Sequence, residues 1–216
     1  MLAILIFLSA LSAPLNDSLS EQKVETKQEL NLSFIQQYLP KNPIVVEAGA
    51  RDGRDTLKMA KFWKNGRIYA FEPSPRAYRT LQKRCGKKKN VKAYSIALGS
   101  KIGYAHFYES REASEPQGFL LKLWPREQLS FEEPFEAATT TLDAWAEANQ
   151  VKRIDFLLLD SEVNGMQMLK ASTKILKTVR IIQARSGNID EMKRWLEKEG
   201  FSQIDDSEDP LFVRKV

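Results

Sequence analysis

The chain has 216 residues, of which 43% are hydrophobic and 28% are charged, and its formal net charge is +5. A chain of this size can bury one sizeable core, so a single domain is expected. Its one cysteine, Cys85, excludes an intramolecular disulfide and a cysteine-based zinc site, and its one histidine, His106, excludes a multi-histidine metal centre. The modest net charge does not by itself indicate a nucleic-acid partner.

The N-terminal part differs in composition from the predicted domain, which we place at residues 30–216 after a segment of residues 1–29. Residues 2–13 are an apolar block with small-residue endings like those of a signal peptide, but without a positive n-region. The block is too short to span a bilayer as a plain helix. A secretory or membrane-anchoring segment and a wrongly extended start codon are equally consistent with it. Residues 16–27 are polar and predict a linker or a solvated helix.

The first half of the domain alternates between strand and helix patterns. Apolar residues at helical spacing predict a helix over residues 30–39, which Pro40 ends. There follow a strand at 44–47, a helix at 56–63, a strand at 67–72, a helix at 75–84 with Pro75 in its first turn, and strands at 91–97 and 103–109. Residues 110–135 contain three prolines and no clean period, so they predict a long loop that is a candidate lid or substrate segment.

The second half continues the alternation. A helix that begins near residue 142 has Thr141 or one of its neighbours as its expected N-cap, and a continuous apolar strand at 154–159 ends in Asp160. A helix at 166–176, a strand at 179–184 and a helix at 190–199 that ends at Gly200 precede two terminal strands at 201–204 and 211–216. This order predicts an α/β fold with a mostly parallel sheet, helices on both faces and a C-terminal antiparallel strand pair.

The stretch at residues 44–56 carries the most functional information. An apolar strand ends at Glu47, a Gly-x-x-x-Gly turn runs from Gly49 to Gly53, and the next strand ends in Glu72. A glycine loop after one strand and a carboxylate at the tip of the next form the nucleoside-binding corner of a doubly wound sheet, where the carboxylate can accept both ribose hydroxyl protons. An ordinary glycine turn between a strand and a helix is the alternative, and Glu72 weighs against it.

The type of nucleoside follows from what this loop lacks. The dinucleotide fingerprint G-x-G-x-x-G is absent, because Arg51 stands two residues after Gly49. Asp52 and Asp55 lie around the helix start, where carboxylates repel a phosphate. A sulfonium ligand with an amino-acid tail fits better, because Glu47 or Asp52 can meet its ammonium group. The pattern therefore indicates S-adenosylmethionine.

Five ordered segments between about residues 43 and 176 resemble the FkbM family of S-adenosylmethionine-dependent methyltransferases. They are VEAGARDG with DT at 46–56, IYAFEPSP at 68–75 with Tyr78 and Leu81, ALGS at 97–100 with Gly103 before FY at 107–108, TTLDAW at 140–145, and IDFLLLDSE at 154–162. The resemblance implies a Rossmann-like class I methyltransferase fold. It also implies methyl transfer to an oxygen, often of a sugar or another small metabolite.

The resemblance also implies roles for particular residues. The methionine end of the cofactor would be lined by Glu47, Gly49, Asp52 and Gly53, with Ala48, Asp55 and Thr56 as further cofactor-binding candidates. Glu72 would bind the ribose, and Pro73, Ser74, Ile96 and Ala97 would lie near the adenine. Asp160 would face the transferred methyl group or the acceptor. Asp160 and Glu162 are the candidate catalytic residues, since either could take the proton of an acceptor hydroxyl. A metal shared by these two acids is a minor alternative, and no metal site is predicted.

The chain departs from the family pattern on the acceptor side. The family usually has glycine at the position of Val163 and a second glutamate at the position of Gly165, and it often has an acid where this chain has Gln183. Arg185 follows Gln183 in the sequence. These changes keep an alternative open, in which the protein binds S-adenosylmethionine without catalysing transfer. Among the aromatic residues, Trp63, Trp145 and Trp195 are expected in the core, and Trp124 is expected in the acceptor pocket or pinning the lid.

The partners are predicted from charge and cofactor. We expect a small-molecule or glycan acceptor. Residues 76–92 are dense in Lys and Arg and could face RNA or a membrane, and an RNA methyltransferase is a third hypothesis. We favour instead a solvated helix C-terminus, where cations suit the helix dipole. No aromatic residues that could stack on bases are interleaved with the cations, so a nucleic-acid partner is disfavoured. Supply of the cofactor favours the cytoplasm, while residues 2–13 leave secretion or membrane association open.

Overall fold

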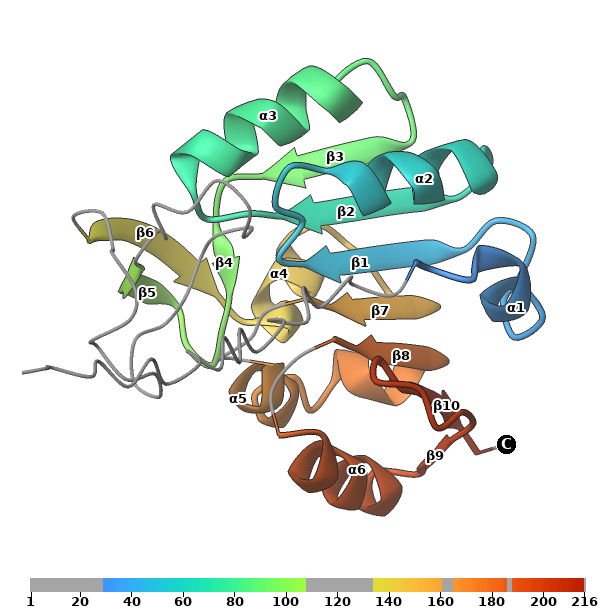
Figure 1. Ribbon diagram of the computed structural model, residues 1–216. Coiled ribbons are helices and arrows are strands. Elements are labelled where there is room, and N and C mark those ends of the chain that lie inside the picture. The colour runs from blue at the N-terminus through green and yellow to red at the C-terminus, as the bar shows by residue number, and fades with distance from the viewer. Residues whose placement is uncertain (1–28, 108–133, 161–164, 186–187, 216) are drawn as a thin grey trace, which may run out of the picture.

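The computed structural model describes residues 29–107, 134–160, 165–185 and 188–215. Its main sheet has seven strands, and their order in the sheet is β3, β2, β1, β7, β8, β10, β9. The first five are parallel, and β10 runs antiparallel to both of its neighbours (Figure 1). The bounds are β1 (Ile44–Ala48), β2 (Arg67–Phe71), β3 (Val91–Tyr94), β7 (Phe156–Leu159), β8 (Ile181–Ala184), β9 (Phe201–Gln203) and β10 (Leu211–Arg214). The predicted parallel sheet and terminal antiparallel pair are confirmed.

Both faces of this sheet are covered, because its central strands are apolar on both sides. Val45 and Phe156 pack with α1 (Leu32–Gln36) and α2 (Arg54–Phe62) in one core cluster. Val46 and Leu157 pack in a second cluster with α4 (Leu142–Ala148), α5 (Gly165–Lys170), the 3₁₀ helix η1 (Ile175–Thr178) and α6 (Ile189–Lys198). The remaining helix, α3 (Pro75–Cys85), packs over Ala70. Continuous apolar strands of this kind are typical of buried parallel sheets.

A small second sheet has the order β4, β6, β5 and corrects the predicted strand at 91–97. Its strands are β4 (Ala97–Leu98), β5 (Gly103–Phe107) and β6 (Phe135–Thr140). The carbonyl of Tyr94 accepts the N–H of Glu72 at 3.0 Å, after which the chain bends, and Ala97 pairs with Thr139 instead. The sequence did not predict β6, because it is a short run of small and polar residues whose partners lie about 30 residues earlier.

Helix ends follow local capping, as predicted. The side chain of Thr141 accepts the N–H of Ala144 at 3.1 Å, and Gly200, just after α6, has a φ of 86°. The predicted helix at 166–176 is wrong as one element, because α5 ends at Lys170 and η1 begins five residues later. The carboxylate of Asp143 accepts the N–H groups of Lys174 and Ile175, and so it caps a separate helical turn.

Some predicted features lie outside the described residues. They are the apolar block at 2–13, the loop at 110–133 with Trp124, and Glu162 with Val163. Within the described ranges, no helix has the length and apolar character needed to cross a membrane. Trp63 and Trp145 are buried, as predicted, whereas Trp195 is only partly buried beside α5.

Candidate cofactor and catalytic site

The loop after β1 folds back over the end of β2. The N–H groups of Gly49 and Ala50 both donate to the carbonyl of Phe71, at 3.0 and 2.9 Å. Three loop residues, Gly49, Arg51 and Gly53, have positive φ angles of 89°, 51° and 78°. A Cβ atom on Gly53 would come within 2.5 Å of the Leu81 side chain of α3. Glycine is therefore required at this position by both backbone conformation and space.

Glu72 fastens this loop to the end of β2. Its Oε2 accepts the N–H of Arg51 at 2.7 Å, and its Oε1 accepts the N–H of Ser74 at 2.8 Å. The side chain of Ser74 in turn accepts the N–H of Ala77 at 3.1 Å and caps α3. The Glu72 carboxylate thus lies between the glycine loop and the start of α3, at the carboxyl edge of the sheet. This is where open α/β sheets bind their ligands.

Glu47 is the most perturbed acid near this edge. It is 1% exposed, and its Oε2 accepts the hydroxyl of Thr56 in the first turn of α2 at 2.5 Å. Burial raises the pKa of Glu47 from its ordinary value of 4.5 to about 8; the Thr56 hydrogen bond opposes this shift, and the charges of Asp55 and Asp160 add to it. The carboxyl group is therefore protonated at neutral pH, and a cation placed beside it would favour its ionised form.

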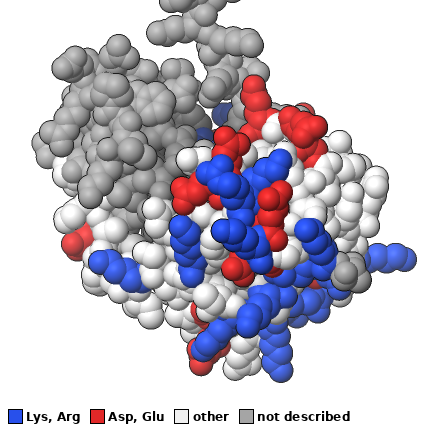
Figure 2. All heavy atoms as spheres, turned by 90° about the horizontal axis from the view of Figure 1, so that it is seen from below, with Lys and Arg blue, Asp and Glu red and all other residues white. Residues whose placement is uncertain are grey.

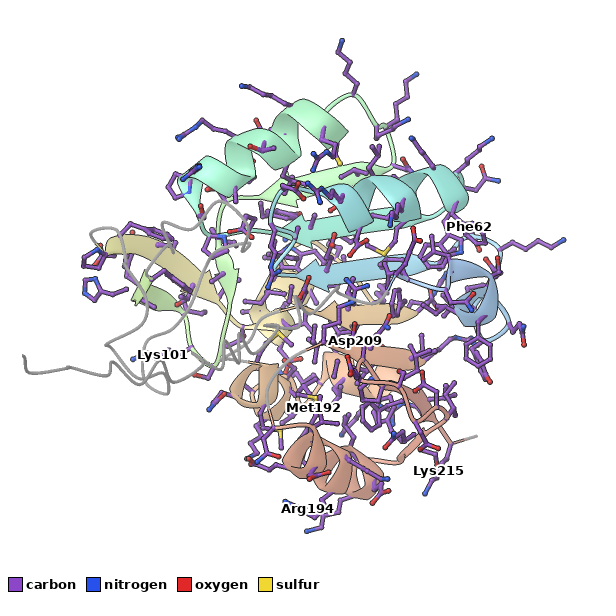
Figure 3. The ribbon with its side chains drawn as sticks, viewed as in Figure 1. Phe62, Lys101, Met192, Arg194, Asp209 and Lys215 are labelled. Carbon is purple, nitrogen blue, oxygen red and sulfur yellow. The ribbon has the colours of Figure 1, made fainter. Side chains whose placement is uncertain are left out.

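A buried ion-pair cluster lies beside Glu47, and its centre is Arg185, whose side chain is 1% exposed. Arg185 follows β8, and its Nη1 lies 2.5 Å from Oδ2 of Asp55 and 3.8 Å from Oδ2 of Asp160. Its Nε lies 3.4 Å from Oδ2 of Asp209, which precedes β10 and is labelled in Figure 3. Arg51 approaches Asp160 from the glycine loop, with its Nη2 3.8 Å from Oδ1. One arginine thus connects α2, β7 and the turn before β10.

The structure brings most of the predicted site residues to this edge. Ala48 ends β1 and is buried, and Asp55 and Thr56 begin α2 beside Glu47. Asp160 follows β7, whose end is level with that of β1 in the sheet. Pro73 lies between Glu72 and the α3 cap. The role of these residues in binding stays a prediction.

Other predicted residues have different surroundings. The Asp52 carboxylate forms ion pairs with Arg84 of α3 at 2.7 Å and with Arg54 at 3.0 Å. Its cationic partners in the structure are therefore these two arginines, whereas the predicted partner was the ammonium group of the cofactor. Ile96 is partly buried against the core, and Ala97 belongs to the small sheet. Glu162 is outside the described residues. Gln183 donates from Nε2 to the carbonyl of Asp209 at 3.2 Å, and this hydrogen bond supports the same turn that Arg185 contacts.

Arg185 is the residue that sequence reasoning undervalued. The sequence showed only an arginine shortly after a strand, and its closest partner, Asp55, is 130 positions away. Its place after a buried parallel strand was the available signal, since such positions gather at the ligand-binding edge. Among the described residues, no three His, Cys, Asp or Glu side chains form a group that could hold a metal ion. His106 is exposed on β5 of the small sheet, where it pairs with Glu136 of β6.

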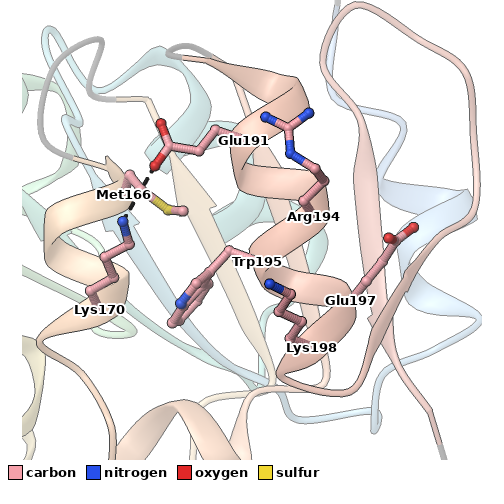
Figure 4. Close-up of a pocket in the computed structure, with 7 residues that line it drawn as sticks. All are labelled: Met166, Lys170, Glu191, Arg194, Trp195, Glu197 and Lys198. Carbon is pink, nitrogen blue, oxygen red and sulfur yellow. Dashed lines mark hydrogen bonds and ion pairs between the residues drawn. The ribbon is translucent and has the colours of Figure 1, made fainter.

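A separate groove lies between α5 and α6 and shares no residue with this site (Figure 4). Its volume is about 490 Å³. Lys170 and Glu191 form an ion pair of 3.3 Å across it. The lining residues are Met166, Lys170, Glu191, Arg194, Trp195, Glu197 and Lys198.

Comparison with known proteins identifies the family. Among curated proteins, the 2-O-methyltransferase NoeI of Sinorhizobium fredii is 21% identical over 150 residues, which are 65% of this chain and 62% of NoeI. The methyltransferase sdnD of Sordaria araneosa is 37% identical over 68 residues, which are 30% of this chain and 26% of sdnD. The chain thus spans less than two thirds of either relative.

A solved structure, the precorrin-6y C5,15-methyltransferase of Geobacter metallireducens, aligns over 89% of each chain with a TM-score of 0.50 and 14% identity, and it shares the Rossmann-like fold. Residues 47–202 match the model of the methyltransferase FkbM domain. This match covers more than half of the chain and contains the glycine loop, Glu72 and Asp160. The chain therefore belongs to the FkbM methyltransferase family.

Proposed function

We propose that the protein uses S-adenosylmethionine to methylate a hydroxyl oxygen of a sugar or another small metabolite. One observation carries the proposal: β1, β2 and β7 of an FkbM domain bring the glycine loop, Glu72 and Asp160 together at the carboxyl edge of one sheet. The name of NoeI, a 2-O-methyltransferase, supports oxygen as the acceptor atom.

The residues at this edge fit such a cofactor chemically. The Glu72 carboxylate lies between the glycine loop and the start of α3, where its oxygens accept the N–H groups of Arg51 and Ser74. A carboxylate accepts several hydrogen bonds at once, so Glu72 is the residue that we assign to the ribose hydroxyl groups. The buried cluster contains three aspartates, Asp55, Asp160 and Asp209, against two arginines, Arg51 and Arg185, so it has one net negative charge. A cation beside Glu47 would also favour its ionised form. This charge suits a ligand with a sulfonium and an ammonium group better than it suits a phosphate.

Asp160 has the best position for a role in transfer. When bound, the cofactor supplies an activated methyl group, and the protein must align an acceptor hydroxyl with it and take up the hydroxyl proton. The Asp160 carboxylate is 6% exposed at the tip of β7, between the guanidinium groups of Arg51 and Arg185. These two groups hold the carboxylate in place at the strand tip, and an acceptor hydroxyl would have to approach it alongside them.

Calorimetric titration with S-adenosylhomocysteine tests the cofactor assignment. We expect the wild-type chain to bind with micromolar affinity and Glu72→Ala to abolish binding, because the ribose ligand and the anchor of the glycine loop are both lost. Glu147→Ala, which removes an exposed carboxylate from α4, is the matched control and should bind like the wild type. Absence of binding by a folded wild-type chain would disprove the proposal.

Binding without catalysis is the second candidate, and one observation favours it. Asp160 is already engaged by two arginines, and the chain departs from the family pattern at Gly165 and Gln183. Transfer of a labelled methyl group to a panel of sugars separates the two candidates. For a working enzyme, we expect Asp160→Asn to keep the affinity for S-adenosylhomocysteine and to lose transfer by about 10²-fold or more. Tight binding with no transfer to any hydroxyl compound would favour a cofactor-binding protein.

A further inference from the structure

The segment between Glu72 and Glu109 has an unusual charge. It contains nine Lys and Arg residues and no Asp or Glu, whereas the rest of the chain has more acidic than basic residues. In the fold, this segment forms α3, the edge strand β3 and the small sheet's β4 and β5. Seven of these cations lie on α3 and the turn after it, and one of them, Arg84, is paired with Asp52. We call the other six the basic face: Arg76, Arg79, Lys83, Lys87, Lys88 and Lys89.

The basic face points into solvent. Arg76, Arg79 and Lys83 are exposed and follow one another at spacings of three and four residues, which places them along one side of α3. Side chains with nitrogen ends project outward from α3 and its following turn in Figure 3. Within the described parts of the chain, no carboxylate forms an ion pair with Arg79, Lys83 or the three lysines that follow the helix.

The helix dipole accounts for only part of this pattern. Cations are favourable in the last turn of a helix, where Lys83 and Arg84 lie, but they are unfavourable near its start. Arg76 occupies the first turn of α3, which contains no acid, whereas α2, α4 and α6 each have an acid there and α1 and α5 have none. The dipole therefore does not explain the cation at the start of α3.

A different helix provides the contrast. Figure 2 shows the side of the molecule on which α6 lies, and there basic and acidic side chains are interspersed. Lys193, Arg194 and Lys198 of α6 alternate with Asp190, Glu191 and Glu197. A mixed surface of this kind produces little net field, whereas the basic face attracts anions over its whole length.

We propose that the basic face binds the anionic headgroups of a membrane surface. The face is the outer side of a helix, and cations on a convex surface suit a broad anionic surface. Tyr78 is the one aromatic residue of residues 75–92. Its hydroxyl group donates a hydrogen bond to the carbonyl of Ala93 and accepts one from Nε2 of Gln82. A single-stranded nucleic acid would require aromatic stacking platforms.

The apolar block at residues 2–13 adds a second weak membrane signal in the sequence, and stable attachment generally needs two such signals.

The test measures binding of the full chain to vesicles by co-sedimentation. We expect binding to phosphatidylcholine vesicles that contain about 30% phosphatidylglycerol, little binding to pure phosphatidylcholine, and a marked decrease between about 50 and 300 mM salt. The variant K87Q/K88Q/K89Q should reduce partitioning by up to about 100-fold, since each lysine near an anionic surface contributes roughly fivefold.

The variant K193Q/R194Q/K198Q removes the same charge from the mixed surface of α6 and is the matched control. It should reduce partitioning by less than about fivefold. Equal midpoint temperatures of thermal unfolding for both variants and the wild type would establish that each variant is folded. Equal binding to neutral vesicles, equal losses in both variants, or binding of a short RNA in place of anionic vesicles through Lys87–Lys89 would each overturn the proposal.

Discussion

Strands β7 and β8 have an aspartate–arginine ion pair at both of their ends. At the start of the strands, Asp155 pairs with Arg180 at 3.3 Å, and at their end Asp160 pairs with Arg185 at 3.8 Å. The chemistry is the same, but the burial differs. The side chain of Arg180 is 59% exposed, whereas that of Arg185 is 1% exposed.

This difference distinguishes a structural ion pair from the candidate site. At the start of the strands, a single buried acid, Asp155, accepts the N–H of Ile44 at 2.8 Å, and its two arginine partners remain in water. At the other end, Arg185 is buried among three acids, and the pKa of Glu47 is raised beside them. An ion pair with water-exposed arginines, such as that of Asp155, is sufficient to hold the two strands together. Buried charges with perturbed pKa values at the carboxyl edge are instead typical of functional sites.

The largest expected effect comes from removing the buried arginine. Arg185→Met should lower the free energy of unfolding by about 3–5 kcal/mol, because it leaves the carboxylates of Asp55, Asp160 and Asp209 without their shared cation. Urea unfolding at pH 7 measures this loss. Arg180→Met, the same substitution at the other end of β8, is the control and should cost less than about 1 kcal/mol, because its ion pair is open to water. Equal costs would remove the distinction between the two ends.

The second effect depends on pH. The pKa of Glu47 is about 8 in the folded chain and 4.5 ordinarily, so the folded state binds the proton more tightly between these pH values. The wild type should therefore lose stability as the pH rises from about 4.5 to 8, relative to Glu47→Gln, which stays neutral. We expect equal stability near pH 5 and a variant that is more stable by a few kcal/mol at pH 8, since one pKa unit corresponds to about 1.4 kcal/mol. A difference that does not change with pH in urea unfolding would contradict the buried, protonated state.

The smallest effect is expected at the structural end. Asp155→Asn should cost about 1–2 kcal/mol, because the amide oxygen can still accept the N–H of Ile44 and the arginine partners remain hydrated. It should leave the calorimetric affinity for S-adenosylhomocysteine unchanged, because Asp155 lies at the opposite edge from Glu72. A loss of affinity would show that the two edges are coupled.

The sequence by itself determined the features that depend on neighbouring residues. The strand–helix alternation predicted the parallel sheet, and Thr141 and Gly200 marked helix ends that the structure confirms. The Gly49–Gly53 turn and the position of Glu72 predicted the corner at which the loop and carboxylate meet. These features could be predicted because capping, turn geometry and strand burial are set by a few consecutive side chains.

Only the tertiary structure decided which distant charges meet. Arg185 reaches Asp55 across 130 positions, and Asp52 turns toward Arg84 of α3 across 32 positions. The pairing of β6 with β4 and β5 likewise joins segments that are distant in sequence. Such contacts depend on the order of strands in the sheet and on the angle at which each helix packs, and no local pattern of side chains records either of these.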